Sequence, residues 1–250
     1  MRKLLFAMAA ILVGLAVNAQ TTAKSGVKIY KGGICLTINV NDVDSVVFFG
    51  DGSTQPGSYE AIDLGLPSGL KWASCNIGAT QPEQPGSYFA WGETQPKQIY
   101  DWDTYKWCNG TDSIMTKYVT NSEFGHVDNL DVLQPEDDAA HVNWGGAWRM
   151  PTKDEFDELI HKCKWTLISM DNGSNVFQVT GPNGNSIMLP IGGYKNGGLL
   201  SSLNKYGNYW TSNLRPVYNN NAISADMVDK NIDWMYHTRQ EGYNIRPVTK

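Results

Sequence analysis

The sequence carries little charge and has no cluster of basic residues. Charged residues make up 18% of the 250 residues, and the formal net charge is −5. A surface that binds nucleic acid normally gathers Lys and Arg on one face, so this class of partner is not indicated. Beyond the N-terminus no apolar stretch has the length that a membrane span needs. We also find no internal repeat and no low-complexity tract.

The residue types that usually carry catalysis lack a recognisable spacing. The four histidines are scattered and form no H-E-x-x-H pattern. No serine lies in a nucleophile-elbow context, and the four cysteines do not have the spacing of a zinc pair. The sequence therefore predicts no catalytic residue, no metal site and no cofactor.

An acidic cluster near the middle of the chain offers one alternative. Its carboxylates could give oxygen ligands to calcium, although their spacing does not match an EF-hand loop. We instead expect Asp137 and Asp138 to cap a helix and the other members to be solvated. The members are Asp128, Asp131, Glu136, Asp137 and Asp138.

Glycine and tryptophan, by contrast, are plentiful, with 25 and 9 residues. With low charge, this composition is typical of a compact, loop-rich extracellular domain. The length suffices for one sizeable domain and an accessory segment.

The N-terminus has the pattern of a secretory signal peptide. Arg2 and Lys3 precede an apolar run at residues 4–17, and the small residues of VNA at 17–19 fit a cleavage site. A membrane anchor is the alternative, but the run is short for a span. We predict a signal peptide over residues 1–19 and export to the periplasm, the cell surface or the medium, where disulfides are permitted.

Composition divides the remaining chain into three parts. Residues 20–50 predict a small β segment, because apolar residues alternate at 27–30 and 34–38 and an apolar strand follows at 45–49. Residues 51–58 are rich in Gly, Ser and Pro and predict a linker. The main domain is expected over residues 59–250.

The best-defined element of the main domain is a helix over residues 152–163. Thr152 is a good N-cap, and Glu155 stands three residues later, which completes a capping box. Acidic residues fill the first turns, where the helix dipole favours them. One face is apolar at spacings of three and four: Phe156, Leu159, Ile160 and Cys163.

Short elements are expected around this helix. Strands are predicted at 59–64 and 70–75, a long irregular region at 76–135, and a short helix that begins near Asp137. Further strands are predicted at 164–170, 176–180, 186–189, 209–212, 222–227 and 243–248. The predicted fold class is α+β.

Several segments together resemble a known family. They are IDLGLPSGLKWASCNIGA at 62–79, YFAWGET at 88–94, DDAA at 137–140, WGGAWRMPT at 144–152 and IRPV at 245–248. In content and order they are similar to the Fibrobacter succinogenes major paralogous domain proteins of Bacteroidetes. The resemblance covers residues 59–250, and residues 27–49 resemble a short segment often found before such domains.

The resemblance implies a C-type-lectin-like fold, with two helices, a twisted antiparallel sheet and long loops. Structural roles are expected for residues within or near the matching segments: Trp91, Glu93, Trp148, Arg149, Thr152, Glu155 and Arg246. We expect Glu93 or Glu155 to pair with Arg149 or Arg246, because a buried carboxylate needs a cation. A disulfide between Cys75 and Cys163, which lie at a strand end and a helix end, is a further expectation.

RMPT at 149–152 with Glu155 is also similar to a motif of formylglycine-generating enzymes, which share the lectin-like fold. Those enzymes need a C-terminal cysteine pair to bind copper, and no cysteine follows Cys163. The calcium-dependent sugar-binding lectins use Glu-Pro-Asn or Gln-Pro-Asp with Trp-Asn-Asp, and none of these tripeptides occurs here. Neither activity is indicated by motif.

The last third of the chain is rich in Asn, Tyr, Gly and Ser, a mixture that antibody paratopes also use. The alternative is that Asn and Gly only build turns. The candidate ligand-binding residues are Tyr194, Asn196, Tyr209, Tyr218, Asn220, Trp234 and Tyr236.

These observations predict an exported, non-enzymatic domain that binds a protein or glycan through the loops around residues 194–240. The second hypothesis is a structural or fimbrial subunit that assembles through the N-terminal β segment. A formylglycine-generating type of enzyme is the least favoured.

Overall fold

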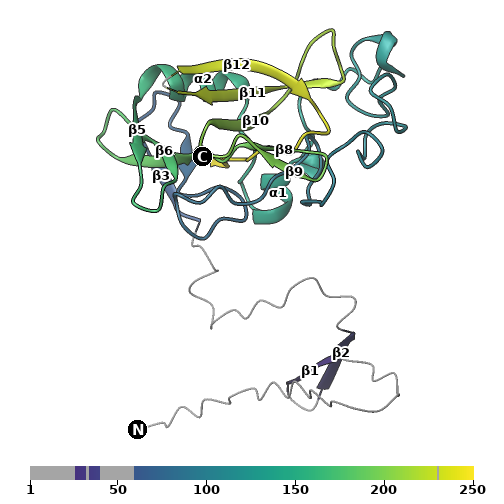
Figure 1. The fold of residues 1–250 in the computed structure, drawn as a ribbon, viewed down its shortest axis with the longest axis horizontal. Coiled ribbons are helices and arrows are strands. Elements are labelled where there is room, and N and C mark those ends of the chain that lie inside the picture. The colour runs from purple at the N-terminus through teal and green to yellow at the C-terminus, as the bar shows by residue number, and fades with distance from the viewer. Residues whose placement is uncertain (1–25, 32–33, 40–58, 230) are drawn as a thin grey trace. The chain divides into compact units, whose positions relative to one another are not determined.

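The computed structural model describes residues 26–31, 34–39, 59–229 and 231–250 (Figure 1). The chain divides into two units, Met1–Phe49 and Gly50–Lys250. In the first, β1 (Gly26–Lys31) pairs antiparallel with β2 (Ile34–Asn39). The predicted signal peptide (1–19), the linker (51–58) and the strand expected at 45–49 lie outside the described residues.

The second unit is mixed and sheet-rich, which confirms the α+β class. Its helices are the short 3-10 turns η2 (Ser122–Phe124) and η3 (Pro135–Asp137), α1 (Ala139–Trp144) and α2 (Lys153–Lys162). Its strands are β3 (Ala61–Asp63), β4 (Lys71–Ala73), β5 (Lys164–Ser169), β6 (Asn175–Thr180), β7 (Ser186–Pro190), β8 (Tyr194–Asn196), β9 (Leu199–Ser201), β10 (Tyr206–Leu214), β11 (Asn221–Val228), β12 (Asn231–Thr238) and β13 (Val248–Thr249).

All strand pairs are antiparallel and form small sheets. The longest strands make the sheet β10–β11–β12, with β11 in the centre. The other sheets of this unit are β13–β4–β3, β5–β6–β7 and the hairpin β8–β9. Figure 1 shows α2 next to β11 and β12, on one side of the central sheet.

The predicted helix is confirmed as α2. The Thr152 hydroxyl accepts from the Glu155 amide (3.2 Å), and the Glu155 carboxylate accepts from the Thr152 amide (2.9 Å). This capping box satisfies two amides that the helix itself leaves free. Phe156 and Leu159 are fully buried and join α2 to the core.

The core under α2 includes one face of the central sheet. Tyr209, Ala225 and Met227 lie in a single cluster with Phe156, and Trp234 of β12 packs at its margin. Because side chains alternate across a strand, the residues between them point to the opposite face. That opposite face is polar near its centre, at Asn208 and Asp226, both of which are buried.

The region at 76–135 is mostly irregular, as predicted, and is fixed by side chains instead of ladders. Buried Arg239 donates to the Lys117 carbonyl (3.0 Å), the Asn219 carbonyl (2.9 Å) and the Tyr105 hydroxyl (2.8 Å). Its guanidinium carbon also lies 4.9 Å from the Trp91 ring centre. Carbonyls from distant segments thus hold this cation without a carboxylate.

One expected strand is wrong, and β12 and the hairpin β8–β9 were not predicted. A strand at 243–248 is not formed, because Tyr243 and Asn244 make only isolated bridges and the ladder is limited to β13. The strand β12 was not predicted, although Ile232, Trp234 and Tyr236 recur at every second position, which is the pattern of a half-buried strand. The hairpin β8–β9 was missed because its strands have three residues each.

The expected disulfide between Cys75 and Cys163 is also wrong, because both thiols are free. Cys75 Sγ is directed to the carbonyl of Ala79 in its own turn (3.7 Å). Cys163 packs beside the core under α2. Burial raises the pKa of both thiols, that of Cys163 to about 11, with the Glu158 charge as the second cause.

The expected ion pair is confirmed for one combination, Arg149 with Glu155. Both guanidinium NH groups donate to the carboxylate, one over 2.7 Å. Glu93 instead accepts from Lys97 Nζ (2.9 Å). Arg246 is fully buried and donates to Asn76 Oδ1 (2.8 Å) and to backbone carbonyls.

Two tryptophans with expected structural roles lie against other aromatic residues or the core. Trp91 is fully buried, and its indole NH donates to the Thr211 carbonyl (2.9 Å). Trp148 is half-buried and packs edge-on against Trp144 of α1.

The acidic cluster has mixed roles. Asp138 caps α1 by accepting from the Ala140 and His141 amides, as expected. Asp137 does not cap a helix, because it pairs with Lys117 (2.6 Å) and accepts from the Tyr118 hydroxyl (2.7 Å). Asp128 is not simply solvated either, because three backbone amides donate to it.

Candidate functional site

A surface groove lies where the β10–β11 loop meets the outer strand β12. It has a volume of about 330 Å³ and is lined by Arg215, Pro216, Val217, Tyr218 and Tyr236. This volume is at the lower end of the range for small-molecule sites. We call these five residues the Arg215 groove.

The centre of the Arg215 groove is a cation held by two aromatic rings. The Arg215 guanidinium carbon lies 4.4 Å from the ring centre of Tyr218 and 4.4 Å from that of Tyr236. Within the described residues, the Arg215 side chain makes no ion pair and no hydrogen bond. Its planar N–H donors are therefore available to a ligand.

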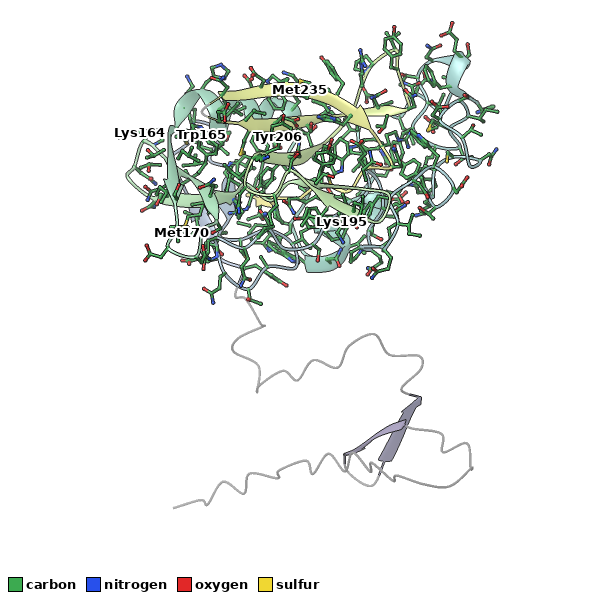
Figure 2. All side chains as sticks on the ribbon, in the orientation of Figure 1. Lys164, Trp165, Met170, Lys195, Tyr206 and Met235 are labelled. Atoms are coloured by element: carbon green, nitrogen blue, oxygen red, sulfur yellow. The ribbon has the colours of Figure 1, made fainter. Side chains whose placement is uncertain are left out.

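The aromatic walls are exposed. Tyr218 is 51% exposed, Tyr236 is 45% exposed and Val217 is 60% exposed. Large exposed aromatic side chains gathered around one arginine are typical of binding hot spots. Met235, the neighbour of Tyr236 on β12, is also exposed and is labelled in Figure 2.

The loop that carries Arg215 and Tyr218 is fixed by hydrogen bonds to buried residues. Fully buried Asn219 accepts from the amides of Thr120 and Asn121 over 2.7 Å each, and it donates to the Thr120 hydroxyl. Arg239 donates to the Asn219 carbonyl (2.9 Å). A loop held by such contacts presents its side chains in a fixed arrangement, which lowers the entropy lost on binding.

The same loop contains a strained turn. Val217 has a φ of 73°, and the Tyr218 amide donates to the Pro216 carbonyl (2.9 Å), which defines the rare form of γ-turn. A β-branched residue in this region of φ costs about 1–3 kcal/mol. Asn121 Nδ2 donates to the Val217 carbonyl (2.8 Å) and helps to hold the turn. Strain of this kind is often found at ligand clamps.

The structure brings together two of the predicted ligand-binding residues, Tyr218 and Tyr236, through Arg215. Asn220 lies in the same loop, is half-buried and leaves its Oδ1 without a partner. It does not line the groove.

Three other predicted residues lie elsewhere. Trp234 packs on Phe156, and its indole NH donates to Asp157 Oδ1 (3.1 Å). Tyr194 and Asn196 both belong to β8. Tyr194 packs on Tyr243, and the exposed Asn196 side chain donates to Glu241.

The prediction for Tyr209 is wrong. Its side chain is fully buried in the core under α2, where its hydroxyl donates to the Pro190 carbonyl (2.8 Å). Burial raises the pKa of this phenol, so it remains a neutral donor. A side chain without exposed surface cannot contact a ligand.

A polar cluster on the opposite face of the central sheet was also missed. Asp226 accepts three hydrogen bonds, from Asn208 Nδ2 (2.8 Å), Ser224 Oγ (2.6 Å) and His237 Nε2 (2.7 Å). Ser224 donates to the carboxylate and not to the histidine, so the nucleophile–base contact of a hydrolase triad is not formed. We interpret this cluster as structural.

Arg215 is the main residue of the groove that sequence reasoning missed. The available signal was its position three residues before Tyr218, because Arg and Tyr together are frequent in binding hot spots. Nothing local could indicate Tyr236, which lies on another strand.

Among the described residues, no group of three or more His, Cys, Asp or Glu side chains is arranged to hold a metal ion. No helix in the part of the chain that the structure describes is long and apolar enough to cross a membrane. Comparison with protein-family models, with curated proteins and with solved structures finds no match to this chain.

Proposed function

We propose that this protein is an exported, non-enzymatic binding domain that recognises a glycan or protein through the Arg215 groove. The observation that carries the proposal is the contact of one unpaired guanidinium with two half-exposed tyrosines on a braced loop. Rigid aromatic side chains and arginine provide most of the binding energy in many interfaces.

We further propose that the scaffold is C-type-lectin-like and of the major paralogous domain type. Two features support this proposal. The long irregular region at 76–135 is fixed by buried side chains, and the helix after WRMPT packs on an antiparallel sheet. Export is supported by the N-terminal sequence pattern alone.

Arrays of glycans and of extracellular proteins, probed with the purified chain, test the proposal. The variant that removes the walls of the groove is Tyr218→Ala combined with Tyr236→Ala. We expect the double variant to lose at least tenfold in affinity for any ligand that the parent chain binds, because each ring is a large contact area.

The matched control is Tyr206→Ala. Tyr206, labelled in Figure 2, is 41% exposed, close to the value for Tyr236, but it is not among the residues that line the groove. The proposal is contradicted when the double variant binds as the parent does, with an unchanged melting temperature.

A structural or fimbrial subunit remains the second candidate, and the hairpin β1–β2 favours it. A hairpin of two strands is marginally stable alone, and among the described residues β1 and β2 pair only with each other. An edge of this kind can accept a further strand. Polymers in native extracts that vanish on deletion of residues 27–49 would favour this function.

A further inference from the structure

We infer that the ligand of the Arg215 groove is an acidic saccharide, with a sugar carboxylate on Arg215 and a sugar ring on the tyrosines. This inference rests on the proposed function and narrows its ligand class. It follows from three properties of the groove: an unpaired cation, two tyrosines that are about half exposed, and a small volume.

The cation determines the charge of the ligand. A guanidinium in contact with two rings is restricted in orientation, and its N–H groups form a planar fork that matches a carboxylate. Among the described residues no carboxylate occupies this fork, whereas the other arginines are all engaged: Arg149 by Glu155, and Arg239 and Arg246 by carbonyls and neutral side chains. Of the four arginines in the part of the chain that the structure describes, Arg215 is the one available to an external anion.

The tyrosines favour a saccharide over an acidic peptide. The face of an aromatic ring is negatively polarised, so it attracts the C–H groups of a pyranose ring, and an Asp or Glu side chain offers fewer such groups. About half of each tyrosine side chain is exposed. Cavity size agrees, because about 330 Å³ suits a small ligand unit, whereas a protein partner needs a much larger contact surface.

The fixed loop at residues 215–220 explains how a small site could bind one unit of a polymer. Asn219 and Arg239 fix the loop before the ligand arrives, so little ordering entropy is lost. One uronic acid unit would occupy the groove, and neighbouring units of the chain would extend over the exposed surface beside Val217.

Calorimetric titration of the purified chain with oligogalacturonate tests the inference. We expect Arg215→Gln to weaken binding about tenfold to a hundredfold, the range for a lost hydrogen bond to a charged group. Arg215→Lys should recover only part of the affinity, because an ammonium keeps the charge but lacks the planar fork. The control is Lys164→Gln. It removes an exposed cation on β5 that does not line the groove, and it should leave the affinity unchanged (Figure 2).

The methyl ester of the same oligosaccharide lacks the negative charge but keeps the sugar rings. It therefore separates the contribution of charge to the affinity from that of ring stacking. The parent chain should bind the ester as weakly as Arg215→Gln binds the acid, and Arg215→Gln should not distinguish the two ligands. Binding of the acid should also weaken as salt is added.

Three results would overturn the inference. Equal binding of acid and ester by the parent, with loss in the Tyr218→Ala, Tyr236→Ala double variant, would leave a binding domain for neutral glycans. Equal or tighter binding of oligoglutamate at the same residues would leave a domain for acidic peptides. In both cases the proposed function stands. Binding that is unchanged in every groove variant overturns the inference and the proposed function together.

Discussion

The buried groups on the two faces of the sheet β10–β11–β12 are stabilised by different interactions. On the face toward α2, Tyr209, Ala225 and Met227 pack against the apolar side of the helix. On the opposite face, the buried Asp226 carboxylate is satisfied by hydrogen bonds from its neighbours. Hydrophobic stabilisation depends on the apolar area buried and the volume filled, whereas a buried carboxylate depends on each donor. The comparison predicts that filled volume matters around Phe156 and that hydrogen-bond geometry matters around Asp226, beside the apolar cluster that Trp210 and Ala222 form on the same face.

The largest effect is expected from Phe156→Ala. This side chain is fully buried and meets the rings of Trp72 (5.2 Å) and Trp234 (6.1 Å). We expect unfolding free energy to fall by about 3–5 kcal/mol, the range for removal of a buried aromatic side chain. Urea denaturation followed by tryptophan fluorescence measures this loss.

Phe156→Leu provides the control, because it keeps most of the volume and should cost clearly less than the alanine variant. Equal losses for both variants would contradict the view that this face depends on filled volume.

A smaller loss is expected on the polar face from Asp226→Asn. The amide keeps the size of the side chain but removes the charge and one acceptor, so at least one of its three donors loses a good partner. We expect a cost of about 1–3 kcal/mol. Urea titration measures it, and Asp233→Asn, an exposed neighbour across the β11–β12 ladder, is the matched control. A variant as stable as the parent would show that the network is not needed on this face.

The N-cap of α2 should matter less again. Thr152→Ala removes the hydroxyl that accepts from the Glu155 amide, while the helix keeps its buried face. We expect a loss of about 1 kcal/mol, measured as a shift of the urea midpoint. Thr152→Ser keeps the cap and should restore most of the stability. A loss as large as that of Phe156→Ala would mean that capping, not packing, holds α2.

The smallest effect on stability is expected from the pair Arg149–Glu155. Both side chains are partly exposed, so solvent screens the attraction between their charges. Burial, the largest single cause, raises the pKa of Glu155, but hydrogen bonds from Arg149 and from the Thr152 amide together outweigh it and hold this pKa below its usual 4.5. A depressed carboxyl pKa adds stability above pH 4.5, and this contribution is lost as the pH falls through the folded-state value. Arg149→Gln should therefore cost about 0.2–1 kcal/mol at pH 7 and nothing once Glu155 is protonated. Urea titrations at pH 7 and near pH 3 compare the two chains. A difference that stays constant with pH would mean that Arg149 acts by packing alone.

Local patterns predicted the helix and many strands correctly because their causes are local. The strands β5, β6, β7 and β11 were found from short runs of alternating or apolar residues. β12 was missed although Ile232, Trp234 and Tyr236 recur at every second position, so this miss has no tertiary cause. The exported, ligand-binding role stays a prediction from composition and resemblance.

By itself, the sequence determined α2 and its capping box, because these contacts join residues within a few positions. It left open whether Glu93 or Glu155 pairs with Arg149 or Arg246, and the structure selected Glu155 with Arg149. Only the tertiary structure decided the Arg215 groove. Tyr236 reaches Arg215 across the sheet, and the loop between β10 and β11 is fixed by residues about a hundred positions away. The tertiary structure also placed Tyr209 in the core, although the surrounding sequence, rich in Asn, Tyr, Gly and Ser, predicts a binding surface. The physical reason is that burial and the sharing of hydrogen bonds between distant segments depend on how strands meet, which no local pattern specifies.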